Sequence, residues 1–372
     1  MIVGTVKEIK KHEYRVGLTP DCVKAYVQQG HSVLVQKDAG LSASFSNEDY
    51  RTSGADIVDT AIDVFDQAEM IVKVKEPIQQ EYSLFRTGQS LFTYLHLAAD
   101  KPLTEMLMEK KIKAVAYETI EDANRQLPCL RPMSEIAGRL SVQEGAKYLE
   151  KTFGGRGILL GGVPGVRRGK IAILGGGIVG TNALKIAVGI GAQVTVLDLN
   201  ADRMAYLDDI FGSSITTLYS TEANIESAIS EADVVIGAVL LPGAAAPKLV
   251  RKEHLKLMKP GSVLVDVAID QGGCFETSRP TTHDDPIYIV DNIVHYCVAN
   301  MPGAVALSST MALTSTTLRY GISLANKGFE KACLEEAGLM KGLNTYGGCC
   351  VYEGVARSLK LPYTPAKGLL AS

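Results

Sequence analysis

The sequence predicts an α/β protein of two domains, in which a central Rossmann-type, doubly wound parallel sheet is inserted into a discontinuous Rossmann-like α/β substrate domain. Three observations predict this fold class. The chain has 372 residues, which exceeds what one ordinary hydrophobic core contains. Strand-like and helix-like segments alternate from the N-terminus onward. A glycine motif typical of dinucleotide binding begins only at Gly175, so the length of a whole domain precedes it.

The first 128 residues carry short apolar runs separated by helical stretches, which is typical of an open parallel sheet. Thr19 and Pro20 have the residue types of a helix N-cap and a first helical turn. We predict strands at Ile2–Val6, Ser32–Val35, Met70–Val74, Ser90–Tyr94 and Lys113–Ala116.

The central segment, residues 129–304, is predicted to be the dinucleotide-binding domain. It opens with an expected helix at Arg131–Tyr148, which has an apolar side. Six strand candidates follow, the number that a complete doubly wound sheet contains. They lie at Lys170–Leu174, Gln193–Asp198, Ser214–Leu218, Asp233–Ala238, Ser262–Val267 and Pro286–Val290.

After Pro302 the pattern becomes helical, at about Leu307–Ala325 and Phe329–Glu336. We expect this tail to have no sheet of its own and to fold back on the first domain. The substrate domain therefore comprises residues 1–128 plus 305–372, and we expect the active site in the cleft between the two domains.

Composition excludes several classes of function. Hydrophobic residues make up 46% and charged residues 21%, as in soluble globular proteins, and the net charge of −3 with no long basic run disfavours a nucleic-acid partner. The uncharged stretch 303–318 is rich in Ser and Thr, which favours a buried helix over a membrane span. Seven scattered cysteines without a Cys-x-x-Cys pair argue against a zinc or disulfide framework. We expect a cytoplasmic protein with no membrane partner.

Gly175, Gly177 and Gly180 follow a predicted strand and open a predicted helix. Their expected roles are a tight turn, close approach of a pyrophosphate to the backbone, and close packing of helix on strand. Asp198 closes the next strand, where a carboxylate accepts hydrogen bonds from the adenosine ribose and repels a 2′-phosphate. These features predict NAD as the cofactor, although the nearby Arg203 weakens the preference over NADP. The alternative is a glycine-rich turn that binds no ligand.

Ligands of open parallel sheets lie beyond the carboxyl ends of the strands. The loops at Val239–Gly243, Ala268–Gly273 and Val298–Gly303 follow three predicted strands, so we expect them at the nicotinamide end. Asp270 is the acidic residue of these loops, and it is either a reactive group or an ordinary turn aspartate.

Three candidate reactive groups lie at strand ends of the first domain. Arg15 follows the first strand, and its planar guanidinium suits bidentate binding of a carboxylate; it is otherwise one of several solvated charges. Lys75 ends the third strand, where it either binds substrate or is an exposed lysine like Lys73. His96 follows the fourth strand, where it either exchanges protons near neutral pH or caps a helix.

At these residues the chain resembles the alanine dehydrogenase and transhydrogenase family. The resemblance extends over nearly the whole chain in order. The matching segments are Lys7-Glu8, Arg15–Pro20, Val74–Pro77, Tyr94–Ala98, Arg131–Glu135, Gly175–Gly180, Val265–Gly273 and Asn300–Gly303.

The resemblance implies NAD-dependent, reversible oxidative deamination of L-alanine to pyruvate and ammonia by a homohexamer. It assigns substrate binding to Arg15 and Lys75, and catalysis to His96 and Asp270. It adds Ser134, Arg203 and Ser220 to the cofactor contacts. The full set of cofactor-binding residues that we predict is Ser134, Gly175, Gly177, Ile178, Val179, Gly180, Asp198, Arg203, Ser220, Val239, Leu240, Ile269, Asn300 and Met301.

The resemblance also raises a magnesium site made by an acid and a histidine. Glu118 has the residue type of the acid, but Lys327 lies in the region where the histidine is expected, so we predict no metal. Three other functions stay open: a transhydrogenase-like NAD-binding subunit, a lysine- or saccharopine-type dehydrogenase, and a non-catalytic NAD-responsive binding protein. The transhydrogenase subunit generally lacks the histidine found here at position 96.

Overall fold

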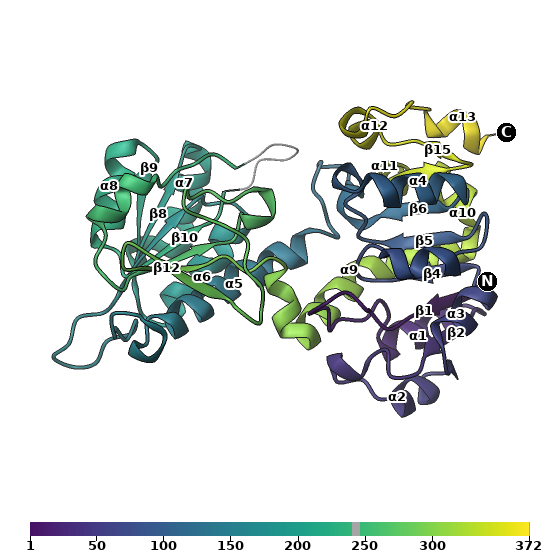
Figure 1. The fold of residues 1–372 in the computed structure, drawn as a ribbon, viewed down its shortest axis with the longest axis horizontal. Helices are drawn as coiled ribbons and strands as arrows, with labels where there is room; N and C mark the ends of the chain where they lie inside the picture. Colours follow the sequence, from purple (N-terminus) through teal and green to yellow (C-terminus); the bar gives the residue numbers. More distant parts are fainter. Residues whose placement is uncertain (240–245, 372) are drawn as a thin grey trace. The chain divides into compact units, whose positions relative to one another are not determined.

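The computed structural model describes residues 1–239 and 246–371. The chain divides into two compact units, one formed by Met1–Pro132 with Val305–Ser372 and the other by Met133–Ala304. Each unit is built on its own predominantly parallel sheet with helices against it (Figure 1). The predicted α/β fold class is therefore confirmed.

The sheet of the first unit runs in the order β3-β2-β1-β4-β5-β6-β14-β15. Strands β1 to β6 are parallel, and the chain reverses its direction of travel across the sheet between β1 and β4. The carboxyl ends of these two strands thus form the topological switch point, where doubly wound sheets bind ligands. The bounds are β1 Ile2–Thr5, β2 Ser32–Gln36, β3 Asp56–Val58, β4 Met70–Val72, β5 Ser90–Thr93, β6 Lys113–Ala116, β14 Leu343–Tyr346 and β15 Cys349–Cys350.

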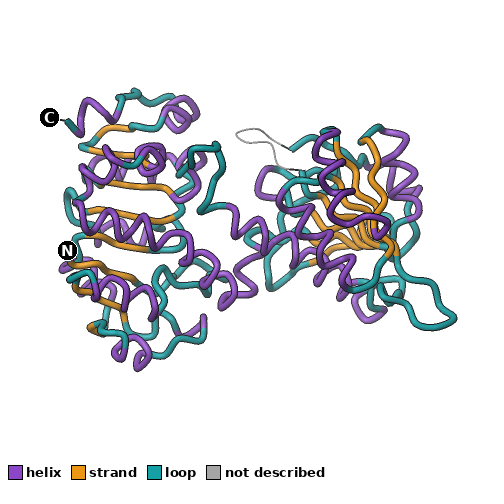
Figure 2. Tube along the Cα trace, turned by 180° about the vertical axis from the view of Figure 1, so that it is seen from behind, coloured by secondary structure: helices purple, strands orange, loops and turns teal. Residues whose placement is uncertain are grey.

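Helices cover both faces of this sheet (Figures 1 and 2). The first begins as predicted, because the Thr19 hydroxyl accepts a hydrogen bond from the Cys22 amide at 3.2 Å. The long helix α9 packs so closely on α1 that a Cβ at Gly321 would lie 2.0 Å from the Tyr26 hydroxyl. The bounds are α1 Pro20–Gln28, α2 Asn47–Thr52, α3 Ala61–Gln67, α4 Lys101–Glu109, α9 Ala306–Lys327, α10 Phe329–Glu335, α11 Ala337–Gly342, α12 Glu353–Leu359 and α13 Ala366–Leu370.

The C-terminal tail has no sheet of its own, as expected, but it adds two strands that were not predicted to the sheet of the first unit. Strand β14 pairs antiparallel with β6, and β15 pairs antiparallel with β14. Gly347 and Gly348 join the two strands and both have positive φ, at 59° and 87°. Two consecutive glycines between short strands indicate a hairpin. The pattern is weak here because β14 has four residues and β15 only two.

The sheet of the second unit runs in the order β12-β13-β11-β10-β7-β8-β9. Its switch point lies between β7 and β10, which pair in parallel. Strands β7 and β8 have the predicted bounds, and β9, β10 and β11 differ from prediction by one residue at their ends. The bounds are β7 Lys170–Leu174, β8 Gln193–Asp198, β9 Ile215–Tyr219, β10 Val234–Gly237, β11 Val263–Asp266, β12 Ile287–Val290 and β13 Ile293–Tyr296.

The sixth parallel strand of this sheet was wrongly predicted at 286–290. That segment forms β12, which pairs antiparallel with β13, and it is β13 that lies parallel to β11. Asp291 and Asn292 join them with φ values of 48° and 62°. Two consecutive residues of positive φ make the tight hairpin turn that reverses the chain here.

The helices of the second unit are α5 Arg131–Tyr148, whose bounds are those predicted, α6 Ile178–Gly189, α7 Ala201–Phe211 and α8 Glu222–Glu231. They pack on both faces of the twisted sheet (Figure 2). None of the helices that the structure describes is long and apolar enough to cross a membrane.

Candidate active site

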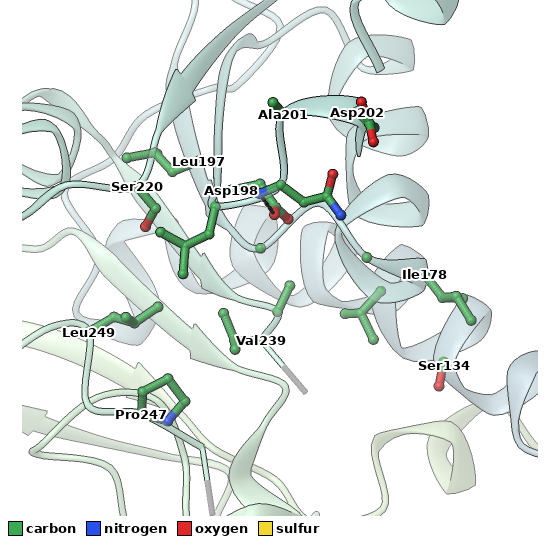
Figure 3. A pocket seen from close by; sticks show the side chains of 16 residues that line it. Ser134, Ile178, Leu197, Asp198, Ala201, Asp202, Ser220, Val239, Pro247 and Leu249 are labelled. Carbon is green, nitrogen blue, oxygen red and sulfur yellow. Dashed lines mark hydrogen bonds between the residues drawn. The ribbon is translucent and has the colours of Figure 1, made fainter. Parts of the chain in front are cut away.

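A cavity of about 780 Å³ opens at the carboxyl ends of β7, β8 and β10 in the second unit (Figure 3). Its volume is that of a pocket for a small molecule or cofactor. The residues that line it are Ser134, Gly175, Gly177, Ile178, Val179, Leu197, Asp198, Leu199, Asn200, Ala201, Asp202, Ser220, Ala238, Val239, Pro247 and Leu249.

The three motif glycines have separate structural reasons. Gly175 has a φ of 104°, and a Cβ there would lie 2.9 Å from the Ala238 carbonyl oxygen. Gly180 lets α6 approach the turn, because a Cβ there would lie 1.8 Å from the Gly175 carbonyl oxygen. At Gly177, the N-cap of α6, a Cβ would meet no atom within 4 Å, so this face of the loop is open. An open backbone at a helix N-terminus fits the pyrophosphate of a dinucleotide.

Asp198 ends β8 and lies in this cavity (Figure 3). Its Oδ2 accepts a hydrogen bond from the Gly176 amide at 2.6 Å, and its Oδ1 accepts one from the Asn200 amide at 2.9 Å. The carboxylate is thereby held against the glycine turn, and lone pairs remain on both oxygens for ribose hydroxyls.

Arg203 extends from α7 to the same turn. Its Nε donates to the Gly176 carbonyl oxygen at 2.6 Å, and its Nη2 contacts the Thr181 hydroxyl. Its guanidinium also lies 4.8 Å from the centre of the Tyr206 ring. Arg203 therefore supports the glycine turn and is not among the residues that line the cavity.

Most of the predicted cofactor residues line the cavity, namely Ser134, Gly175, Gly177, Ile178, Val179, Asp198, Ser220 and Val239. Gly180 lies beneath the turn. Ile269, Asn300 and Met301 are outside the lining, and Leu240 lies outside the described residues. Sequence reasoning missed Leu197, Leu199, Asn200, Ala201, Asp202, Ala238, Pro247 and Leu249. The residues at 197–202 lie at the end of β8 or directly after it, so the predicted strand could have identified them. Pro247 and Leu249 carry no sequence signal.

Asp270 lies in a short 3₁₀ turn, Ile269–Gln271, after β11, and its side chain is exposed. The buried carboxylate of Asp266 holds the loop that contains it. Asp266 accepts hydrogen bonds from the Ala268 amide at 3.1 Å, the Cys274 amide at 3.0 Å and the Ser278 hydroxyl at 2.5 Å. Burial raises the pKa of Asp266, while these donors partly offset the effect. Asp266 therefore fixes the start of the loop, while the Asp270 side chain stays exposed.

In the first unit, Arg15 and Lys75 belong to the segments that follow β1 and β4, the two switch-point strands. The loop after β1 packs tightly here, since a Cβ at Gly17 would lie 2.6 Å from the Val72 carbonyl oxygen. Arg15 is buried, and its Nε and Nη2 bind the Glu13 carboxylate at 2.7 and 2.5 Å. Glu13 thus occupies the edge of the guanidinium formed by Nε and Nη2. A substrate carboxylate cannot bind bidentately to that edge and must contact Arg15 from another side.

Lys75 is a destabilised cation beside Arg15. Desolvation lowers its pKa from the usual 10.5, and the positive charge of Arg15 lowers it further. The carboxylates of Glu76 and Glu13 act in the opposite direction, but the net shift in the pKa of Lys75 is downward. An anion would stabilise the charged form of Lys75, whereas the charge of Arg15 is already balanced by Glu13.

The alternative lysine, Lys73, has a structural role. It is fully buried, and its ammonium binds the carboxylates of Glu8 at 3.0 Å and Glu81 at 2.7 Å. Burial alone lowers a lysine pKa, but these two carboxylates outweigh it and raise the pKa of Lys73. Glu8 also accepts hydrogen bonds from the amides of Val74 and Lys75, at 2.6 and 3.2 Å. The buried ion cluster therefore fixes the backbone of Lys75.

His96 follows β5, the strand adjacent to β4, and its side chain is exposed. Its backbone is left-handed, with φ 50° and ψ 34°. Its ring stacks on that of Tyr94, with centroids 5.9 Å apart and planes 8° from parallel. The imidazole is thus supported on one side by Tyr94 and is otherwise exposed.

Both residues of the possible magnesium site have contacts with protein groups. Glu118 accepts hydrogen bonds from the backbone amides of Leu95 and His96. Lys327, the last residue of α9, forms ion pairs with Glu335 at 3.2 Å and Glu336 at 3.1 Å.

Elsewhere in the described chain, Glu222, Glu226 and His254 have possible ligand atoms within 4.8 Å of one another. Glu222 is ion-paired with Arg251. The Nδ1 of His254 accepts the Arg251 amide at 3.2 Å, which leaves the proton of the neutral ring on Nε2, the atom that faces Glu226. We assign no metal to this cluster, because its side chains already contact Arg251 and one another.

Known proteins resemble this chain over almost its whole length. The sequence profile described as alanine dehydrogenase/PNT, N-terminal domain, matches residues 4–137, and that of the C-terminal domain matches residues 141–353. The alanine dehydrogenase of Methanococcus maripaludis is 57% identical over 100% of both chains. That of Bacillus subtilis is 56% identical over 100% of this chain and 98% of its own length.

Solved structures give the same result. An L-alanine dehydrogenase aligns with a TM-score of 0.95 at 53% identity, covering 97% of this chain and 99% of its own. A transhydrogenase from Sinorhizobium meliloti aligns with a TM-score of 0.82 at 24% identity, covering 95% of this chain and 99% of its own, which shows a shared fold. From the two profiles and the full-length relatives together, this chain belongs to the alanine dehydrogenase/PNT family.

Proposed function

We propose that the protein is an alanine dehydrogenase, which catalyses the NAD-dependent, reversible oxidative deamination of L-alanine to pyruvate and ammonia. The observation that carries the proposal is a pair of buried or partly buried cations, Arg15 and Lys75, in the segments that follow the two switch-point strands. In the same unit, an exposed histidine follows the next strand. Names and lengths of the relatives support alanine as the amino acid. The cation pair supports a substrate with a carboxylate.

We propose that the cavity of the second unit binds NAD. The N-terminus of α6 at Gly177 holds the pyrophosphate, and Asp198 accepts hydrogen bonds from the adenosine ribose and disfavours a 2′-phosphate. Bound NAD supplies a hydride acceptor at nicotinamide C4. We assign Ile269, Asn300 and Met301 to the nicotinamide end as a prediction, because they follow the strands beyond the switch point.

The chain's own residues then perform the remaining steps. Arg15 and Lys75 bind the substrate carboxylate and fix the α-carbon, from which hydride leaves to give an iminium. His96 removes a proton from the water that adds to the iminium and returns it to the amino group. It then takes up the hydroxyl proton as the carbonyl forms and ammonia departs. Lys75 donates a hydrogen bond to the developing carbonyl oxygen, and Asp270 relays or orients a proton.

A spectrophotometric assay tests the proposal. NADH oxidation is followed with pyruvate plus ammonium, and separately with 2-oxoglutarate plus lysine. We expect oxidation only with the first mixture. Oxidation only with the second would replace the proposal with a lysine- or saccharopine-type dehydrogenase. NADH binding without oxidation in either mixture would favour the transhydrogenase-like or the non-catalytic binding function.

The lowered pKa of Lys75 predicts a pH dependence of anion binding. Oxamate resembles pyruvate and its own groups do not titrate in the alkaline range. We expect the inhibition constant of oxamate to rise about tenfold per pH unit as pH rises through the pKa of Lys75, because the neutral amine no longer attracts the anion. This rise should begin at lower pH than for an ordinary lysine, whose pKa is 10.5.

The matched variant is Lys75→Met, in which the inhibition constant should be high and independent of pH over the same range. An unchanged alkaline rise in Lys75→Met would remove Lys75 from the anion site.

We also propose that the protein is a cytoplasmic homohexamer, as the family resemblance implies. Light scattering on the purified protein should give a mass six times that of one chain. A mass of one or two chains would contradict the assembly and leave the proposed chemistry to be judged separately.

A further inference from the structure

His96 has an unusual backbone conformation for the residue that is proposed to transfer protons. Its φ of 50° and ψ of 34° lie in the left-handed region, which residues with a Cβ seldom occupy. Such a conformation persists where neighbouring groups hold it, and it occurs often at functional sites. The direction of the imidazole therefore depends on what holds the peptide between Leu95 and His96.

Glu118 is the group that holds this peptide. It lies in the 3₁₀ turn Tyr117–Thr119 that follows β6, the strand next to β5. Its Oε1 accepts the His96 amide at 2.6 Å, and both of its oxygens lie 3.2 Å from the Leu95 amide. Hydrogen bonds to an ionised carboxylate are shorter and stronger than neutral ones, so the two amides are fixed from one side.

Tyr94 holds the other end of His96, its ring. The Tyr94 hydroxyl donates to the Cys129 carbonyl oxygen at 2.6 Å, and its ring meets that of Tyr117 edge-on at 5.1 Å. The ring on which the imidazole stacks is therefore itself immobilised. Backbone and ring of His96 are both located by neighbours, while the face away from Tyr94 stays exposed.

We propose that Glu118 is a positioning residue, which sets the direction of the His96 imidazole through the Leu95 and His96 amides and does not itself touch the substrate. This inference rests on the proposed function, in which His96 transfers protons. Removing Glu118 should lower kcat and leave the binding of pyruvate and NADH unchanged, because Arg15 and Lys75 follow other strands and the cofactor cavity belongs to the second unit.

The test compares Glu118→Ala, Glu118→Gln and Glu121→Ala in the amination assay. We expect Glu118→Ala to lower kcat ~10- to 100-fold, since a displacement near 1 Å has an effect of this size. Glu118→Gln keeps an acceptor oxygen and should lose less. Glu121→Ala removes the same charge three residues away, from a carboxylate that faces Lys341 at 3.6 Å, and should keep normal kcat. Melting curves identify any variant that fails to fold, and Glu118→Gln then carries the comparison.

A double variant separates positioning through His96 from a general structural effect. If Glu118 acts through His96, Glu118→Ala should cost nothing further in a His96→Ala background. Equal losses in both backgrounds would overturn the inference, as would normal kcat in folded Glu118→Ala. The proposed function fails in a different way, when His96→Ala alone keeps normal turnover.

Discussion

Replacing His96 by alanine is expected to lower turnover of pyruvate and ammonium by about 10²- to 10⁴-fold, the usual contribution of a general acid–base group. The imidazole is exposed and stacks on Tyr94, so we expect its removal to leave the packing of the first unit intact. The dinucleotide cavity belongs to the second unit, so the dissociation constant of NADH should stay that of the unaltered protein. Steady-state kinetics and a fluorescence titration with NADH measure the two quantities.

The matched control is His31→Ala. His31 lies in the same unit, where its ring bonds the Asn326 side chain at 2.7 Å and approaches the N-terminal amine at 3.3 Å. This replacement should leave turnover unchanged. Wild-type turnover in His96→Ala, with normal NADH binding, would exclude His96 from proton transfer.

Lys73→Met is expected to lower the free energy of unfolding by about 3–5 kcal/mol, because removing one partner from a buried ion cluster leaves uncompensated charge. Here the two buried carboxylates of Glu8 and Glu81 would face each other without their shared cation. Urea denaturation followed by circular dichroism measures the loss.

Lys75→Met is the control, two residues along the same segment. It removes a cation whose charged form is already disfavoured by burial and by Arg15, so the protein should unfold at a urea concentration equal to or above that of the wild type. The same variant should lose activity. A Lys73→Met protein that unfolds at the same urea concentration as the wild type would contradict these assignments. So would a Lys75→Met protein that unfolds at a lower urea concentration than Lys73→Met.

Much of the fold could be predicted because apolar runs and turn residues that are close together in the sequence indicate its strands and turns. The runs 170–174 and 193–198 are rich in apolar residues, flank a glycine turn, and form strands with those bounds. The errors fall where a short turn decides the topology. Asp291 and Asn292 turn the chain back on itself and convert an expected parallel strand into an antiparallel edge strand.

The candidate site was less predictable, because its geometry depends on contacts between residues far apart in the chain. The strand-end positions of Arg15, Lys75 and His96 follow from the sequence pattern. The groups that hold Lys75 and His96 do not, since Glu8 binds an amide 66 residues away and Glu118 one 22 residues away. Local periodicity carries no signal for such pairs.

The central claim is that hydride passes from the α-carbon of L-alanine to nicotinamide C4. Oxidation of L-alanine deuterated at the α-carbon, followed by mass spectrometry and proton NMR of the NADH formed, tests it directly. The account predicts one deuterium per NADH, located at C4. NADH formed without the label would contradict the account.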